Sequence, residues 1–120
     1  MSTTIEGVNA PGKLIYQLIV EAQNAATLDR RADVRFAFFR PVSTHLDDGR
    51  LFRGFSREIS ASGIGLAHEA ALPLGELELR ISHEIGYDIR VRTNILWCQS
   101  CGHGWYISGG KFAGPASVIR

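Results

Sequence analysis

Residues 89–97 read IRVRTNILW, and apolar and polar side chains alternate along this stretch. A period of two residues is typical of a β-strand with one buried face and one face in solvent. One face of the strand would carry Ile89, Val91, Thr93, Ile95 and Trp97. The opposite face would carry Arg90 and Arg92. The stretch therefore predicts an amphipathic strand, with Trp97 on the face of the aliphatic side chains.

Similar segments occur on both sides of this strand. Leu77, Leu79 and Ile81 alternate with polar residues in the same way. Further extended segments are predicted at residues 36–42, 51–59, 64–66 and 105–107. Turn-forming residues separate them at 47–49, 60–63, 73–75 and 102–104. Five or six short strands joined by hairpin-like turns predict a mainly all-β fold, a six-stranded antiparallel β-barrel.

The N-terminal part of the chain has a different pattern. Asn9 and Pro11 suit the first turn of a helix, and apolar residues then recur at helical spacing, so we expect an α-helix over residues 11–28. Its apolar stripe must be buried, either against the barrel, which is the favoured interpretation, or against a second copy in a homodimer. The expected organisation is a tail and helix at 1–28, a barrel domain at 29–114 and a short C-terminal tail at 115–120.

Composition and charge fit one globular domain. Of the 120 residues, 45% are hydrophobic and 21% are charged, which argues against a disordered or fibrous chain. The net charge of +1 argues against a protein that binds nucleic-acid polymers through many phosphate contacts. No segment has the roughly 20 apolar residues that span a bilayer, and the N-terminus lacks the pattern of a signal peptide. We expect a cytoplasmic protein that does not insert into membranes.

Arginines are concentrated in one part of the sequence. Of the 13 basic residues, 11 are arginines, and seven of these lie between Arg30 and Arg57. The densest group, Arg30, Arg31 and Arg35, falls at the expected junction between the helix and the first strand. Guanidinium groups donate paired hydrogen bonds to phosphate oxygens and stack on purine rings. The group therefore suits a phosphate-bearing purine ligand, and a solvated run of arginines that complements a helix C-terminus is an equally good interpretation.

A second group is the turn EISASG at residues 58–63. It offers two hydroxyl groups, small side chains and a glycine that lets a backbone approach a ligand closely. Taken alone, it is also an ordinary turn between strands. Together with the arginines, it predicts one groove with phosphate and base contacts from two sides.

These two groups resemble the sequence marks of the PilZ domain family, RxxxR at the entrance to the barrel and (D/N)xSxxG after its second strand. Arg31 and Arg35 match the first mark, with Arg30 extending it, and Ser60 and Gly63 match the second. The resemblance covers about residues 28–114. It implies a barrel of PilZ type that binds cyclic di-GMP on its surface and needs no other cofactor.

The resemblance also implies the residues of the site. The expected ligand-binding residues are Arg30, Arg31, Arg35, Glu58, Ser60 and Gly63. Among them, Arg31 and Arg35 would be the principal anchors. Glu58 stands where the family has Asp or Asn, and it keeps an acceptor for a guanine edge while its extra methylene moves the carboxylate by about 1.5 Å.

The function implied is that of a bacterial second-messenger receptor, which relays the level of cyclic di-GMP to an unidentified effector protein. The alternative is a degenerate PilZ-like domain that binds no nucleotide and acts as a protein-interaction module. Catalysis finds no support, because the sequence offers no nucleophile–base arrangement and no Walker loop. We therefore expect a receptor or adaptor and not an enzyme.

Cys98 and Cys101, followed by His103, have a spacing that zinc ligands use. A structural zinc site needs four ligands, and the sequence has no second ligand pair. The favoured interpretation is a cysteine-containing hairpin turn without a metal, and a metal shared across a dimer is the alternative.

Overall fold

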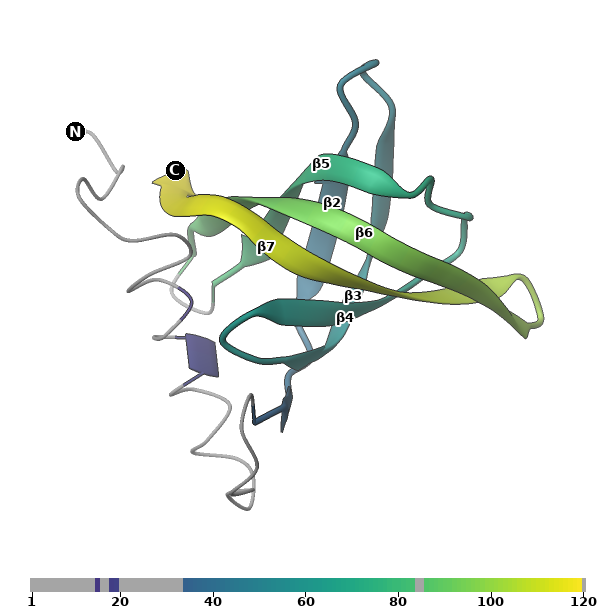
Figure 1. Cartoon of the computed structure of the whole chain (residues 1–120), viewed down its shortest axis with the longest axis horizontal. Coiled ribbons are helices and arrows are strands. Elements are labelled where there is room, and N and C mark those ends of the chain that lie inside the picture. Colours follow the sequence, from purple (N-terminus) through teal and green to yellow (C-terminus); the bar gives the residue numbers. More distant parts are fainter. Residues whose placement is uncertain (1–14, 16–17, 20–33, 84–85, 120) are drawn as a thin grey trace.

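A computed structural model describes residues 15, 18–19, 34–83 and 86–119 of the protein. The strands in these ranges are β1 (Phe36–Ala37), β2 (Pro41–His45), β3 (Leu51–Ile59), β4 (Gly63–His68), β5 (Gly75–Ser82), β6 (Asp88–Gly102) and β7 (Trp105–Ile119), as Figure 1 shows. In the described ranges, no helix is long and apolar enough to cross a membrane.

Six of the strands close into a barrel. In the hydrogen-bonded order β3-β2-β5-β6-β7-β4, each strand is antiparallel to the next, and β4 pairs with β3 to complete the ring. The short β1 adds to β3. The six-stranded antiparallel barrel predicted from the sequence is thus confirmed. The β6–β7 hairpin continues beyond the barrel as a long projecting ribbon (Figure 1).

The core is built from the alternating aliphatic side chains of the strands. On β6, the side chains of Ile89, Val91 and Ile95 are at most 1% exposed, as the period of two predicts. The aliphatic residues of β5 are buried in the same cluster. Each such side chain contributes about 1.5–3 kcal/mol when it is fully buried, so these two strands anchor the barrel.

Trp97 departs from the predicted alternation. Ile95 pairs with Gly110 and Trp97 pairs with Gly109, so β6 has one more residue than β7 at this point. Such a β-bulge interrupts the alternation of faces. Trp97 is 43% exposed, and the prediction that it shares the face of the aliphatic side chains is therefore wrong. The alternation of apolar and polar residues along β6 cannot reveal this bulge, because the residues before the inserted one keep the same alternation.

The predicted N-terminal helix falls mostly outside the described residues and stays a prediction. Three members of its apolar stripe are described: Ile15, Leu18 and Ile19. Ile15 and Leu18, which are 1% and 0% exposed, belong to the same buried cluster as the barrel strands, and Ile19 packs against it. The side chains of Ile15 and Leu18 are therefore buried within the chain itself, as the favoured interpretation of the stripe requires. A homodimer through this helix is not tested.

The C-terminal end differs from the predicted tail at residues 115–120. Strand β7 continues to Ile119, which pairs with Asp88, and Ala116 and Val118 are buried. Val91 pairs with Ala116 and Thr93 pairs with Phe112, so the single residue Arg92 of β6 lies opposite three residues of β7, 113–115, which form an enlarged bulge. Proline has no N–H to donate to a neighbouring strand, so a bulge is a position where a strand tolerates it. Strand β7 therefore includes residues 115–119, which were expected to belong to a tail.

His68 is buried beside the barrel wall. The His68 Nδ1 lies 2.6 Å from the carbonyl oxygen of Ala70, and its Nε2 lies 2.7 Å from the Ser108 hydroxyl. Both His68 and Ser108 are at most 3% exposed. Burial lowers the pKa of His68 below its usual value, and the bond to Ala70 opposes this effect. The imidazole is therefore neutral near pH 7, with Nδ1 donating to Ala70 and Nε2 accepting from Ser108.

The lowered pKa of His68 predicts a loss of stability in acid. The unfolded chain, with a histidine pKa of 6.5, takes up a proton more readily than the folded chain, so protonation favours unfolding. This contribution to stability is complete above that unfolded pKa and is lost as the pH falls through the lowered folded pKa. We expect the free energy of unfolding in urea to decrease between about pH 7.5 and about pH 5.5, with a smaller decrease in His68→Gln.

A matched control is His103→Asn, because His103 is an exposed residue of the hairpin turn with a φ of 57° that asparagine tolerates. This variant should keep the decrease of the unaltered protein. Burial also lowers the pKa of His45, which should account for part of the decrease that remains in His68→Gln. Identical decreases in His68→Gln and in the unaltered protein would contradict the assignment.

Candidate functional site

A shallow trough crosses four strands on the outside of the barrel. The paired residues along this row are Glu58 on β3, Gly65 on β4, Gly109 on β7 and Trp97 on β6. The two central positions are glycines, so the backbones of β4 and β7 form the floor. The side chains of Glu58 and Trp97 stand at the two ends. The neighbouring row contains Ile59, Ile64 and Ile95 and faces the core, which confirms that the trough faces outward.

A pocket of about 130 Å³ occupies this trough. The residues around it that carry side chains are Arg35, Glu58, Ile59, Ser60, Ser62, Ile64, Leu96, Trp97 and Lys111, and four glycines complete the lining: Gly63, Gly65, Gly109 and Gly110. Four of the six predicted site residues therefore line one pocket. The other two, Arg30 and Arg31, lie outside the described residues.

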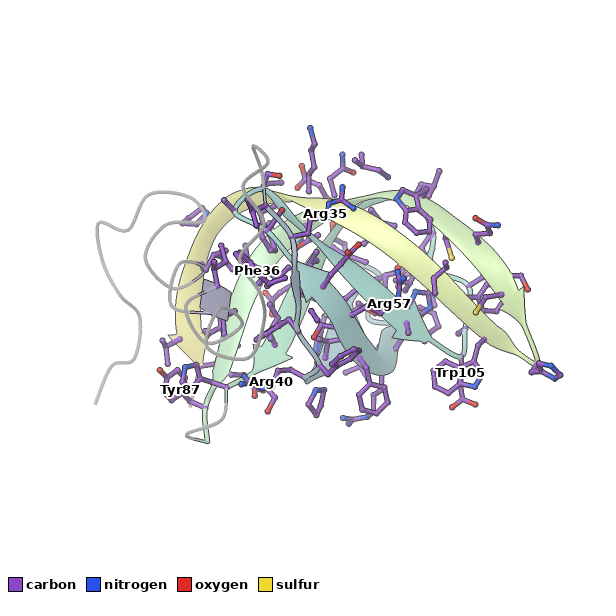
Figure 2. All side chains as sticks on the ribbon, turned by 90° about the horizontal axis from the view of Figure 1, so that it is seen from below. Arg35, Phe36, Arg40, Arg57, Tyr87 and Trp105 are labelled. Carbon is purple, nitrogen blue, oxygen red and sulfur yellow. The ribbon has the colours of Figure 1, made fainter. Side chains whose placement is uncertain are left out.

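Arg35 reaches the pocket because the segment after it is tied to β3. Phe36 and Ala37 pair with β3, and the N–H of Phe38 donates to the carbonyl oxygen of Arg57 at 3.0 Å. The buried Ser56 hydroxyl then donates to the Phe38 carbonyl oxygen at 2.6 Å. Figure 2 shows Arg35 at the rim of the molecule, at the start of this segment.

The side chain of Arg35 forms an ion pair with Glu58. The Nη1 of Arg35 lies 3.3 Å from Oε1 of Glu58, and the two side chains are 65% and 36% exposed. An ion pair in solvent contributes about 0–1 kcal/mol, because water screens it and ordering two long side chains opposes it. Arg35 is therefore held near the pocket by a weak contact that a stronger anion can replace.

The serine turn shapes the wall of the pocket. The Ser60 hydroxyl accepts hydrogen bonds from the backbone N–H groups of Ser62 at 3.3 Å and Gly63 at 3.2 Å. The Ser60 N–H donates to the carbonyl oxygen of Gly63 at 2.9 Å, and Ser60 is only 4% exposed. Its hydroxyl is therefore engaged in holding the turn. Ser60 therefore contributes to the pocket through the shape of the turn.

Gly63 is required for a reason that the sequence did not indicate. A methyl group at this position would overlap the carbonyl oxygen of Gly110 on β7. The sequence suggested that a glycine here leaves room for a ligand, whereas the structure shows that it leaves room for the backbone of the adjacent strand.

Trp97 and Lys111 are pocket residues that the sequence did not reveal. The indole ring of Trp97 lies against Gly109, since a methyl group on this glycine would overlap the ring. Lys111 pairs with Gly63 and adds a cation at the rim. The only sequence signal was the pair Gly109-Gly110 opposite the Trp97 strand, which permits a large side chain to lie flat across β7.

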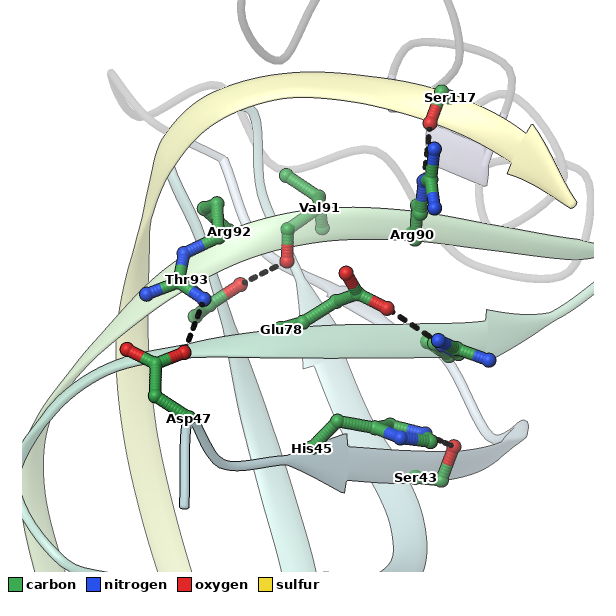
Figure 3. A network of polar contacts seen from close by, with 10 residues as sticks. Ser43, His45, Asp47, Glu78, Arg90, Val91, Arg92, Thr93 and Ser117 are labelled. Carbon is green, nitrogen blue, oxygen red and sulfur yellow. Dashed lines mark hydrogen bonds and ion pairs between the residues drawn. The ribbon is translucent and has the colours of Figure 1, made fainter. Parts of the chain in front are cut away.

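Other arginines of the barrel bond to groups of the chain itself (Figure 3). The Arg92 guanidinium lies 3.1 Å from Asp47, and this contact is the main reason that the pKa of Arg92 is raised. The Nε of Arg90 donates to the Ser117 hydroxyl at 2.9 Å. Neither arginine lines the pocket, so both are part of the barrel surface and not of the site.

Cys98 and Cys101 lie within β6, and the hairpin turn itself is formed by His103 and Gly104, both of which have positive φ. Cys98 is partly buried, Cys101 is exposed, and both are free thiols. In the described part of the chain, no three His, Cys, Asp or Glu side chains are grouped closely enough to hold a metal ion.

The comparisons with known proteins agree with this architecture. The model of the PilZ domain matches residues 29–117. The chain belongs to the PilZ domain family. This match confirms the resemblance seen in the sequence, and PilZ domains are binding and adaptor domains and not enzymes. Comparison with curated protein sequences found no match.

A solved structure with a similar fold is the Bacillus subtilis inhibitor of motility, MotI/DgrA. It superposes with a TM-score of 0.55 and 19% sequence identity over 72% of this PilZ domain chain. The chain spans 44% of the length of that protein. At this identity the likeness supports the fold alone.

The close approach at Gly63 generates a stability prediction. Gly63→Ala should lower the free energy of unfolding by about 1–3 kcal/mol, because the new methyl group must displace a β7 carbonyl. Gly114→Ala is the matched control, since its methyl group would meet only the Arg92 side chain, at ordinary distances of 3.5 Å to Cβ and 3.8 Å to Cγ. Denaturant unfolding should show a change within about 0.5 kcal/mol for Gly114→Ala. Equal effects of the two variants would contradict the role given to Gly63.

Proposed function

We propose that this PilZ domain binds cyclic di-GMP in the pocket between the serine turn and β6, and relays ligand binding to an effector protein. The observation that carries the proposal is the meeting of Arg35, Glu58, Ser60 and Gly63 around one pocket. These are all the described residues among those that the family marks single out. Their placement around one pocket supports the site.

The charges of the pocket suit a phosphate ligand. Arg35 and Lys111 contribute cations at its rim, and a guanidinium can bond two phosphate oxygens at once. A hydrogen bond to a charged group contributes about 1.5–3 kcal/mol, which exceeds the value of an exposed ion pair such as that of Arg35 with Glu58. A phosphate should therefore replace Glu58 as the partner of Arg35. Arg30 and Arg31 would add further cations from the preceding segment.

The flat and polar groups of the pocket suit guanine. Trp97 offers a partly exposed indole face, and stacking of a base on an aromatic ring contributes about 1–3 kcal/mol. Once released from Arg35, the Glu58 carboxylate can accept hydrogen bonds from the N–H groups of a guanine edge. A ligand that combines phosphates with guanine rings would use all of these groups together.

The relay would begin at the segment that carries the arginines. Binding of the phosphates would order residues 30–35 over the barrel and present a changed surface to an effector protein. The barrel is a closed ring of paired strands, so it offers little freedom to move. Strand β1, which follows the arginines, pairs with β3 over only two residues, so we expect the arginine segment to be the moving part.

A degenerate interaction module is the second candidate, and one observation favours it. Glu58 replaces the Asp or Asn of the family mark and pairs with Arg35, one of the expected anchors. In this alternative, Glu58 holds Arg35 permanently, and the pocket binds no nucleotide.

The first binding prediction concerns Arg35. Arg35→Ala should weaken cyclic di-GMP binding tenfold or more in calorimetric titration, because about 1.5–3 kcal/mol of phosphate contact is lost. Arg90→Ala is the control, because Arg90 is an exposed arginine outside the pocket, and it should change the affinity little. Affinity should also fall as salt rises, and GTP or cyclic AMP should compete poorly because neither presents two guanines on a cyclic diphosphate.

Glu58→Asp separates the two candidates. If Glu58 is a tolerated variant of the family acid, the shorter side chain should give equal or higher affinity. If neither the unaltered protein nor Glu58→Asp binds cyclic di-GMP measurably, the receptor function is wrong and the interaction module is supported.

The second binding prediction concerns Trp97. Cyclic di-GMP should change the tryptophan fluorescence of the protein, and Trp97→Ala should abolish the change and weaken binding by about tenfold, since one stacking contact is lost. Trp105→Phe is the matched control, because Trp105 is the other of the two tryptophans and lies at the far end of the β6–β7 hairpin (Figure 2). A fluorescence change that Trp105→Phe abolishes would place the ligand elsewhere.

A further inference from the structure

The outer part of β6 has a free edge. Strand β5 pairs with β6 only from Asp88 to Ile95, whereas β6 continues to Gly102. Residues 96–102 pair with β7 on one side, and none of the residues that the structure describes pairs with their other side. In an antiparallel ladder, alternate residues direct their N–H and C=O groups away from the partner strand. This part of β6 therefore offers unpaired backbone groups to another strand.

The free edge lacks the charges and prolines that commonly protect such edges, and between its two bulges residues 97–100 pair regularly with β7. Residues 96–102 read LWCQSCG and contain no charged residue and no proline, whereas the paired part of β6 carries Asp88, Arg90 and Arg92. Proteins usually prevent pairing at an exposed edge with charges, prolines or a covering segment. The charged residues of β6 thus lie in the part that β5 already covers, and the part with a free edge has no charged residue to prevent pairing with another strand.

Apolar side chains accompany this edge. Leu72, Leu74, Leu96, Trp97 and Tyr106 line a groove beside it. Leu74 is 66% exposed, and Leu96 is 48% exposed. Large exposed apolar side chains grouped in this way mark a surface that is covered by a partner.

We propose that the partner is a second copy of the chain, which pairs its own residues 96–102 with this edge in antiparallel orientation. A two-fold axis would place the same seven residues opposite themselves, as in other symmetric dimers. Because the segment is uncharged, this arrangement brings no like charges together. A foreign strand selected by charge would find no charge here to recognise.

The shape of the molecule permits this contact. The β6–β7 hairpin projects away from the barrel in Figure 1, so two hairpins can lie side by side with their barrels on opposite sides. With Gln99 on the axis, Leu96 of each copy would lie opposite Gly102 of the other, so the hairpin end of one copy would lie beside the apolar groove of the other. Leu96 and Trp97 line both this groove and the ligand pocket, so the second copy would lie next to the pocket. The dimer itself does not depend on nucleotide binding.

The test is the oligomeric state of the ligand-free protein. Sedimentation velocity over a range of concentrations should show a chain of 13.2 kDa associating into a species of twice that mass. Gln99→Lys places a charge in the middle of the edge and should weaken association by about tenfold or more, since the two lysines meet across the axis. Ala113→Lys adds the same charge at an exposed position of β7 outside the edge and should leave association unchanged.

A second measurement uses the native cysteines and no variant. Cys98 and Cys101 lie within the edge, so a short bis-maleimide linker should join them between copies. Mixing protein of natural isotopic composition with ¹⁵N-labelled protein identifies the linked peptides as intermolecular. A protein that remains monomeric at every concentration would overturn the proposal. So would a dimer that Gln99→Lys leaves intact, or one that yields no mixed-isotope link through these cysteines.

Discussion

The absence of two side chains, at Gly65 on β4 and Gly109 on β7, is the constraint on which the site depends. These residues pair with each other on the outer face, where side chains of paired strands normally fill the surface. Without them, the backbone becomes the floor of a pocket, and side chains from the flanking strands lie over it. Glu58 Cγ is only 3.0 Å from the point that a Gly65 methyl group would occupy, and Trp97 covers Gly109. A larger residue at either position would fill the pocket from below.

The floor is also held rigidly from the inside. Ser108 precedes Gly109 on β7, faces the core and bonds to the neutral His68 of β4, so a buried polar contact joins the two strands beneath the pocket. The residue that follows Gly109 on β7, Gly110, is close-packed against Thr93 and Gly63. A closed barrel with such a floor resists deformation. A ligand-dependent signal must therefore arise in the segments attached to the rim, above all the one that carries Arg35.

The sequence predicted the parts of this molecule that follow a regular period or a local spacing. Alternation placed Ile89, Val91 and Ile95 in the core, and the motif spacing brought Arg35 and Ser60 to one pocket. Bulges caused the errors, since one bulge turns Trp97 outward and another carries β7 past Pro115. A bulge depends on the partner strand, which a pattern along one strand does not contain. Lys111 was missed for a similar reason, because only the β4–β7 register brings it beside Gly63.

The departure of Glu58 from the family mark is best judged by comparing free energies. Its ion pair with Arg35 has an N–O distance of 3.3 Å, and an aspartate carboxylate, set back by about 1.5 Å, would not reach Arg35 without a shift of the backbone or of the arginine. The glutamate thus introduces a competitor for the phosphate. An exposed pair contributes at most about 1 kcal/mol, which corresponds to a loss of roughly fivefold in affinity. Competition of this size tunes the affinity of a receptor. To abolish binding, Glu58 would have to act through the geometry of its displaced carboxylate and not through its charge.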